Sequence, residues 1–361
     1  MFNIDLTEKL SMAFGPSGFE EDVIKLIIGE LTDYNIEVDN FNNLYVNVNI
    51  FDYNKKTVML DAHTDEVGFI VQSIALNGLI SFLKIGSIVD ENLKAQKVII
   101  RNELNQFITG IITSRPPHLI RSNDGSLIKN DSLYIDIGAR SDVEVIEKFK
   151  ISIGDPIIPK AEFYSINENE LLCSKAFDNR IGCLCLLELI KKINKKESDV
   201  NLIGSFTSQE EVGCRGAKIS ANKINPDFAI IFEGSPADDV YFDISNPQCV
   251  LNKGPQIRFF DSGMISNREM IKYANKIAMK HNIPIQKAVR YSGSTDASNI
   301  HLSNLGVPCL VLGIPTRYAH THNSIVSVSD LNNTIQLAYH ILDEFSDFMI
   351  EFNKKCNAYK L

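Results

Sequence analysis

The chain has 361 residues, a length that favours two domains over one small core, and its 44% hydrophobic and 22% charged residues are ordinary for a soluble globular protein. A net charge of −9 argues against nucleic acid as a partner. No apolar run approaches membrane-spanning length, and the N-terminus MFNIDLTEKL lacks the form of a signal peptide, so neither a membrane nor an export route is predicted. The seven cysteines show no disulfide framework, which predicts a reducing, cytoplasmic location.

The N-terminal segment has the pattern of an α/β domain. Thr7–Phe14 is predicted to form a short helix. Ser17 and Glu20 then give a capping-box pattern that opens a second, amphipathic helix. Leu44–Val48 alternates like a strand, and the short apolar run Thr57–Leu60 predicts a buried strand.

A His-x-Asp pair follows this buried strand. The His63 imidazole can bind a metal, and Asp65, two residues on, can orient it. The alternative is a capped turn with a hydrogen-bonded histidine. Only carboxylates elsewhere in the chain favour the metal-ligand interpretation.

Between residues 67 and 163 the pattern changes to short β-like runs such as GFIVQSI and FITGIIT, separated by Gly, Asn and Pro. Regularly spaced short strands predict a small barrel or sandwich. The sequence therefore predicts an α/β domain of residues 1–66 and 164–361 with a β-barrel, residues 67–163, inserted into it. His118 lies in a turn of the insert without an acidic neighbour, which favours a structural or surface role.

Asp178 lies just before the predicted helix Ile181–Ile193. One interpretation is a helix N-cap. The other is a carboxylate that bridges two cations, which in two-metal sites lie about 3.5–4 Å apart.

Two adjacent carboxylates, Glu210 and Glu211, follow the apolar run Asn201–Phe206. Neighbouring side chains at a strand end point in different directions, so one could bind a metal while the other acts as a general base. A solvated acidic turn is the alternative. Glu233 ends a further buried strand, Phe228–Phe232, and sites in open α/β sheets collect at the carboxyl ends of strands.

The C-terminal part continues the α/β pattern. Asn267–Lys280 predicts an amphipathic helix, Val307–Leu312 a last buried strand, and Ser329–Met349 a final helix. His320 and His322 both follow the last strand.

The chain contains a series of short motifs: GPSGFEE, AHTDEVGFIV, PPH, DIGA, AFDNRIGC, SQEEVGCRGA, FEGSP, GSTDAS and PTRYAH. Through these motifs the sequence resembles the M42 metallo-aminopeptidases almost from end to end. It implies a zinc-peptidase-like α/β/α sandwich with a mixed sheet and a small inserted β-barrel, whose role would be oligomerisation or substrate access. It also implies two divalent ions per subunit, zinc or cobalt with manganese as a third option, and a homo-oligomer, with a dodecamer as one expectation.

The resemblance also implies roles for residues. His63 and Glu233 would hold one ion, Glu211 and His320 the other, and Asp178 would bridge them. Glu210 would be the general base, and Asp65 would support His63. The family often has Asp where this chain has Glu233, and the motif selects His320 over His322, which is predicted to be a surface or rim residue.

The implied reaction removes N-terminal residues from short peptides with a free N-terminus. A water between the two ions would lose its proton to Glu210 and attack the peptide carbonyl. Two alternatives stay open: a non-catalytic homologue that forms a shell, and a metal-dependent deacylase or glycan hydrolase.

Side-chain preference is not determined by these motifs. The loop Tyr291–Ser298 and the residues after Gly234 are predicted to line the pocket. A basic side chain there, for instance Arg290 or Arg317, would favour acidic N-terminal residues.

Overall fold

Buried strands in the larger part of the molecule send alternate side chains to opposite faces of one sheet. In β3 (Thr57–His63), Val58 and Leu60 belong to one apolar cluster and Met59 to another. The same alternation occurs in β13 (Phe228–Pro236) and β16 (Cys309–Arg317). A sheet that is apolar on both faces must be covered on both, which produces three layers.

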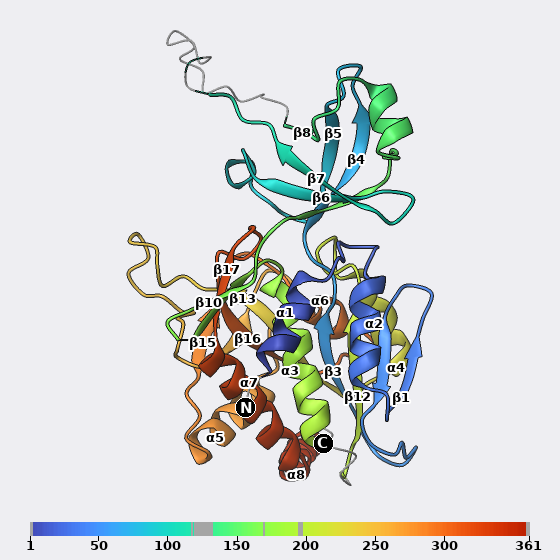
Figure 1. Ribbon diagram of the computed structural model, residues 1–361. Coiled ribbons are helices and arrows are strands. Elements are labelled where there is room, and N and C mark those ends of the chain that lie inside the picture. Colours follow the sequence, from blue (N-terminus) through green and yellow to red (C-terminus); the bar gives the residue numbers. More distant parts are fainter. Residues whose placement is uncertain (1–2, 117, 119–132, 169, 194–197, 359–361) are drawn as a thin grey trace.

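The computed structural model describes residues 3–358 except 117, 119–132, 169 and 194–197, with side chains described to residue 354 (Figure 1). The sheet has eleven strands, and its main path runs β1 (Asn35–Val38), β2 (Leu44–Asn47), β12 (Asn201–Thr207), β3, β13, β16, β17 (Ser324–Ser327), β11 (Leu171–Ser174) and β10 (Tyr164–Ile166). Off this path, β14 (Gln256–Phe260) pairs with β16 and with β15 (Gln286–Val289).

Helices cover both faces of this sheet. The larger cluster includes residues of α1 (Ile4–Met12), α2 (Glu21–Glu30), α3 (Phe177–Ile193), α5 (Arg268–Lys280), α7 (Val328–Asp343) and α8 (Phe345–Ala358). The smaller cluster, on the opposite face, includes residues of α4 (Arg215–Ile224) and α6 (Ala297–Ile300). None of the helices in the described part of the chain combines the length and apolar character needed to cross a bilayer.

A closed six-stranded barrel stands above the sheet and its helices (Figure 1). Its strands follow the order β4 (Gly68–Ile74), β5 (Ile80–Ile85), β8 (Tyr134–Asp136), β7 (Phe107–Ile112), β6 (Lys97–Arg101) and β9 (Pro156–Pro159). Its apolar core is separate from the two clusters of the sheet. The predicted α/β fold with a mixed sheet and a small barrel is therefore confirmed.

Two local predictions are wrong. Ser17 and Glu20 form no capping box, because α2 has no side-chain cap. Glu20 instead accepts hydrogen bonds from the backbone amides of Gly18 (2.7 Å) and Gln209 (3.2 Å). The predicted final helix is two helices, with a break at Glu344.

Candidate active site

Parallel pairing brings the predicted functional residues to one edge of the sheet. Strands β12, β3, β13 and β16 are adjacent and parallel, so their carboxyl ends meet there. His63 is the last residue of β3, and Glu233 lies within β13. Glu210 and Glu211 follow β12, and His320 follows β16.

Asp178 joins this edge from the first turn of α3. Asp178 and Asn179 have non-helical backbone angles, and the peptide bond between them is cis. The Asn179 side chain donates to the backbone oxygen of Phe232 (2.8 Å), which ties this turn to β13. Gly234 permits the close approach, because an added Cβ would lie 2.7 Å from the Asp178 Cα.

The imidazoles and carboxylates form two groups that share Asp178. His63 Nε2 lies 3.3 Å from Asp178 Oδ1 and 3.9 Å from Glu233 Oε1. His320 Nε2 lies 3.2 Å from Asp178 Oδ2 and 3.2 Å from Glu211 Oε1. Each group offers three potential ligand atoms for a metal ion.

The electrostatics of these groups fit a pair of cations. Buried oxygens of Asp178, Glu211 and Glu233 accept no hydrogen bond within the described structure. Burial raises the pKa of Glu211 and of Glu233, since an ionised carboxylate is costly there without a positive partner. Burial opposes protonation of His320, yet Glu211 and Asp178 raise its pKa to about 12, so positive charge is favoured at this position. Imidazole nitrogen and carboxylate oxygen are also ligands that zinc and similar divalent ions accept.

Glu210 lies beside the group that contains His63. Its Oε2 is 3.9 Å from His63 Nε2, and its Oε1 accepts a hydrogen bond from Cys214 Sγ (3.3 Å). Burial raises the pKa of Glu210 well above the usual range, and Asp296 and Glu211 add to the shift. A carboxylate with a raised pKa next to a possible metal pair is suited to accept and return a proton.

Asp65 fixes both the histidine and the turn of the paired glutamates. Its Oδ1 lies 3.4 Å from His63 Nδ1. It also accepts hydrogen bonds from the backbone amides of Glu210 (2.9 Å) and Glu211 (3.1 Å), and from the hydroxyl of Ser17 (2.6 Å). Sequence reasoning missed this role of Ser17, because its spacing to Glu20 imitates a helix cap.

Comparison with known proteins agrees with this geometry. The family described as M42 glutamyl aminopeptidase matches residues 42–337. The chain belongs to the M42 peptidase family. It is therefore a peptide-bond hydrolase of a family that uses divalent metal ions.

Relatives of this M42 peptidase differ in their named substrates. It is 34% identical over 334 residues to the glutamyl aminopeptidase of Lactococcus lactis, covering 90% of this chain and 92% of that protein. It is 30% identical over 353 residues to the lysyl aminopeptidase of Pyrococcus furiosus, covering 95% of this chain and 98% of that protein.

Solved structures share the fold over nearly the whole length. A TET aminopeptidase from a marine-sediment archaeon of the Thaumarchaeota superposes with a TM-score of 0.89 at 34% identity, covering 94% of this chain and 96% of that one. The Pyrococcus horikoshii TET1 peptidase can assemble into a tetrahedron or a large octahedral shell. It superposes with a TM-score of 0.83 at 31% sequence identity, covering 94% of this chain and 98% of that one. A Thermotoga maritima protein named an endoglucanase superposes with a TM-score of 0.76 at 28% sequence identity, covering 95% of this chain and 98% of that one.

A cavity of about 920 Å³ lies beside His320, between the barrel and the sheet domain of the M42 chain. Ser87, Glu91 and Gln96 line it from the barrel side, and residues after Gly234 line it from the other side, as predicted. The predicted Tyr291–Ser298 loop does not contribute to the described lining, although the preceding Arg290 does.

Neither arginine singled out in the sequence is an unpaired cation. Arg290 donates to Asp238 (2.7 Å), and Arg317 forms a two-pronged ion pair with Asp239 (2.9 and 2.6 Å). The expectation that one of them would attract acidic residues therefore loses its basis.

His322 was expected at the surface or rim, but its side chain is buried. His322 is only 4% exposed, and its Nε2 donates to the backbone oxygen of Lys97 on β6 (2.9 Å). His320 Nδ1 likewise donates to the backbone oxygen of Ser87 (2.8 Å). The two histidines thus contact the barrel, while His118 is exposed, as predicted.

A further buried carboxylate was missed. Asp296 is 1% exposed, accepts a hydrogen bond from Thr207 (2.5 Å), and lies close to Glu210 and Cys214. It belongs to the GSTDAS motif, which contributes to the family resemblance but by itself assigns no role to this acid. Only the fold, which brings this loop behind the end of β12, could reveal the contact.

Proposed function

We propose that this M42 peptidase is an aminopeptidase that uses two divalent ions, zinc or cobalt, to remove N-terminal residues from short peptides. The observation that carries the proposal is the pair of ligand groups sharing Asp178, with Glu210 beside His63 of one group. His63 and Glu233 would hold one ion, and Glu211 and His320 the other.

The ions, when bound, would lower the pKa of a water molecule and polarise the scissile carbonyl. Glu210 accepts the proton of the attacking water at a carboxylate oxygen and returns it to the departing amine. The hydrogen bond from Cys214 to Oε1 orients the Glu210 carboxylate, leaving Oε2 directed toward His63. Asp65 acts as a positioning residue, because it holds the backbone of both glutamates.

The test compares Glu210→Gln with Glu211→Gln in the metal-loaded enzyme. Glu210→Gln should lose at least about 10²–10⁴-fold in kcat on peptide and aminoacyl-anilide substrates, the range of general acid–base catalysis, while two ions per chain stay bound. Glu211→Gln should lose an ion as well as activity. Near-normal turnover of Glu210→Gln would remove this residue from the mechanism.

The cavity also supports a substrate preference. Its described lining contains Arg290, which Asp238 neutralises, and Glu91, for which no ion pair occurs among the described residues. Apart from His320, which is proposed to bind an ion, the charged side chains of this lining sum to a negative charge, which would repel an acidic side chain. We therefore propose that neutral or basic N-terminal residues are preferred to acidic ones, and that Glu91→Gln narrows the preference for Lys over Leu in an anilide panel.

Two other functions follow from the alternatives above. A glycan hydrolase is favoured by the endoglucanase name of one structural neighbour. Two results would favour a glycan hydrolase. One is activity on β-glucan oligomers that persists in Glu210→Gln, and the other is activity on these oligomers that exceeds activity on peptides with free N-termini.

A non-catalytic shell protein would instead show assembly without turnover of either substrate. The shell of the TET1 neighbour supports a homo-oligomer here, with a twelve-subunit particle as one expectation that a sizing measurement tests.

A further inference from the structure

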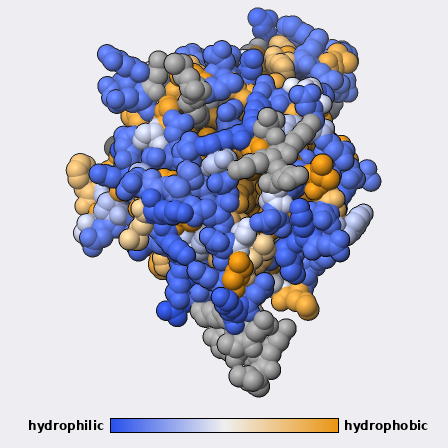
Figure 2. Space-filling model, turned by 90° about the horizontal axis from the view of Figure 1, so that it is seen from below, coloured by the Kyte–Doolittle hydropathy of each residue, from blue (hydrophilic) through white to orange (hydrophobic). Residues whose placement is uncertain are grey.

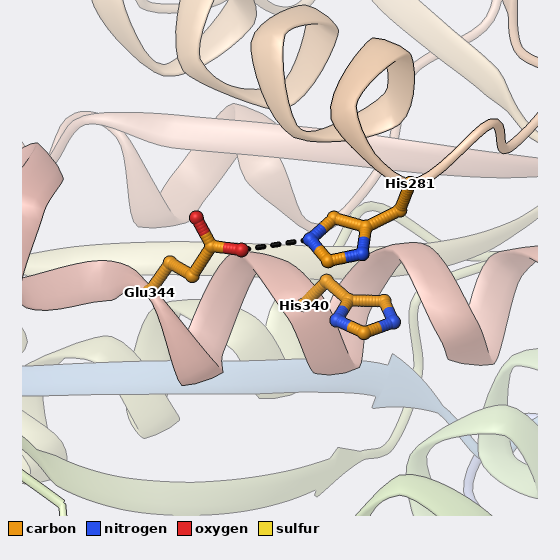
Figure 3. A group of neighbouring side chains, drawn as sticks. All are labelled: His281, His340 and Glu344. Atoms are coloured by element: carbon orange, nitrogen blue, oxygen red, sulfur yellow. Dashed lines mark hydrogen bonds and ion pairs between the residues drawn. The ribbon is translucent and has the colours of Figure 1, made fainter.

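Three side chains of metal-binding types meet at a second place, where α5 and α7 end. His281 is the C-cap residue of α5, His340 lies in the last turn of α7, and Glu344 is the C-cap of α7. Figure 3 shows the His281 ring directed at Glu344, with the His340 ring beside it. This corner belongs to the helices at the end of the molecule remote from the barrel (Figure 1). The surface at that end is mostly hydrophilic (Figure 2).

The three side chains are close enough to share one ion. Their potential ligand atoms all lie within 4.8 Å of one another. His281 Nε2 is 2.7 Å from Glu344 Oε1, and the two imidazole rings are stacked with centroids 3.7 Å apart. His340 and Glu344 are four residues apart, a spacing that places two side chains on one face of a helix.

The contacts of Glu344 and His340 also permit an ion to bind. Lys280 binds Glu344 Oε2 (2.7 Å), so Oε1 can exchange its contact with His281 for a metal ion without breaking that ion pair. No hydrogen bond to a ring nitrogen of His340 occurs among the described residues.

The backbone adds a preference for positive charge. Two helices, of 13 and 16 residues, both end at this corner. Unpaired carbonyl groups give each helix C-terminus a partial negative charge, so two of them together favour a cation.

We propose that His281, His340 and Glu344 form a third metal site, which takes one zinc-like divalent ion per chain and joins α5 to α7. A zinc ion holds imidazole nitrogen and carboxylate oxygen at about 2.0–2.2 Å. The rings must therefore turn out of their parallel stack when the ion binds. The site is separate from the catalytic pair, and its role is to hold two helix ends together.

The test measures zinc binding by the tag-free, full-length protein when the catalytic pair is disabled. The background variant carries His63→Ala and His320→Ala, and equilibrium dialysis against buffered Zn²⁺ counts the ions per chain. Adding His340→Ala should lower the count by one. Adding His118→Ala, which removes an exposed histidine elsewhere, should leave the count unchanged. Equal counts with and without His340 would overturn the proposal.

A second readout does not depend on counting. Zn²⁺ should raise the Tm of the background variant, and this rise should disappear with either His281→Ala or His340→Ala, after circular dichroism has shown that each variant is folded. A Tm rise that survives both substitutions would also overturn the proposal. Because the background already lacks catalytic ligands, neither result depends on whether the catalytic proposal is correct.

Discussion

Glu210 and Glu211 show how two adjacent residues can serve different purposes. Their backbone amides both donate to the carboxylate of Asp65, so the turn is fixed as one unit. From this turn the side chains diverge: Glu211 reaches His320, and Glu210 lies toward His63 and Cys214. Asp65 therefore controls the separation between a possible ligand and a possible base.

Asp65→Asn should impair this control while preserving volume. An amide has one acceptor oxygen, so it cannot hold both backbone amides and the Ser17 hydroxyl as the carboxylate does. We expect activity or metal affinity to fall about 10–100-fold, as for other residues that support metal ligands. Metal content and kcat/KM together measure this. Ser17→Ala should give a smaller loss, and an Asp65→Asn enzyme with unchanged metal affinity and turnover would contradict the positioning role.

Glu233 gives a second prediction at this scale. Its carboxylate oxygen lies 3.9 Å from His63 Nε2, and the shorter side chain of Asp would withdraw that oxygen by about one methylene. Glu233→Asp should therefore weaken binding of one ion and leave the other bound. Stepwise removal of metal with a chelator should show one ion released earlier than in the parent enzyme. A release profile identical to that of the parent enzyme would show that backbone adjustment restores the reach of the side chain.

At the scale of elements, Gly234 and Asn179 place α3 against β13. The Asn179 side chain is bonded to the Phe232 backbone oxygen, and the backbone of β13 at Gly234 lies directly against Asp178. The first turn of the helix is thus fixed in position by a strand that also carries Glu233. One strand therefore positions residues of both ligand groups.

Gly234→Ala should displace Asp178. The added Cβ would lie 2.7 Å from the Asp178 Cα and 3.2 Å from its Cγ, which is too close without a shift of the backbone. We expect a loss of stability of about 1–3 kcal/mol, the usual effect of overpacking, together with loss of both ions, since both groups use Asp178. Urea unfolding and metal analysis measure the two effects. The matched control is Gly29→Ala in α2, where an added Cβ meets nothing within 4 Å.

Sequence predicted the regular elements better than their ends. Thr57–Leu60 was predicted as a strand from its apolar residues, yet β3 continues to His63, because parallel pairing with β12 extends to Thr207. Asn267 caps α5, because its side chain accepts hydrogen bonds from the nearby backbone amides of Glu269 and Met270. Ser17 does not cap a helix, since a residue 48 positions away binds its hydroxyl. Local patterns could not reveal long-range partners such as this one.

At the scale of the whole molecule, the barrel forms one wall of the cavity beside His320. The backbone oxygen of Ser87 accepts a hydrogen bond from His320, and that of Lys97 accepts one from His322. Elsewhere, Arg101 of β6 forms an ion pair with Asp22 (3.3 Å), and its guanidinium lies 4.4 Å from the ring centre of Phe14. The barrel therefore contacts the same segment that supplies a proposed metal ligand. Its position should influence substrate binding.

His322 allows this coupling to be tested without removing a proposed ligand. Burial lowers the pKa of His322, so the ring is neutral near pH 7 and donates through Nε2 to the Lys97 oxygen. His322→Ala removes one of two donors to that carbonyl, which also accepts from the backbone amide of Lys160 (3.0 Å), so the loss should cost about 0.5–1.5 kcal/mol of stability. Because His322 also lines the cavity, KM should rise more than kcat falls. Thermal unfolding and steady-state kinetics at saturating metal measure both effects.

Two variants separate this explanation from a general loss of packing. His322→Gln keeps an N–H donor and should recover part of the stability and of KM, whereas His118→Ala, at an exposed position of the insert, should change neither. If His322→Ala lowered stability but left KM unaltered, the contact with β6 would be structural only. The barrel would then not control substrate access through His322. Other contacts, such as the ion pair between Arg101 and Asp22, would hold the barrel in position.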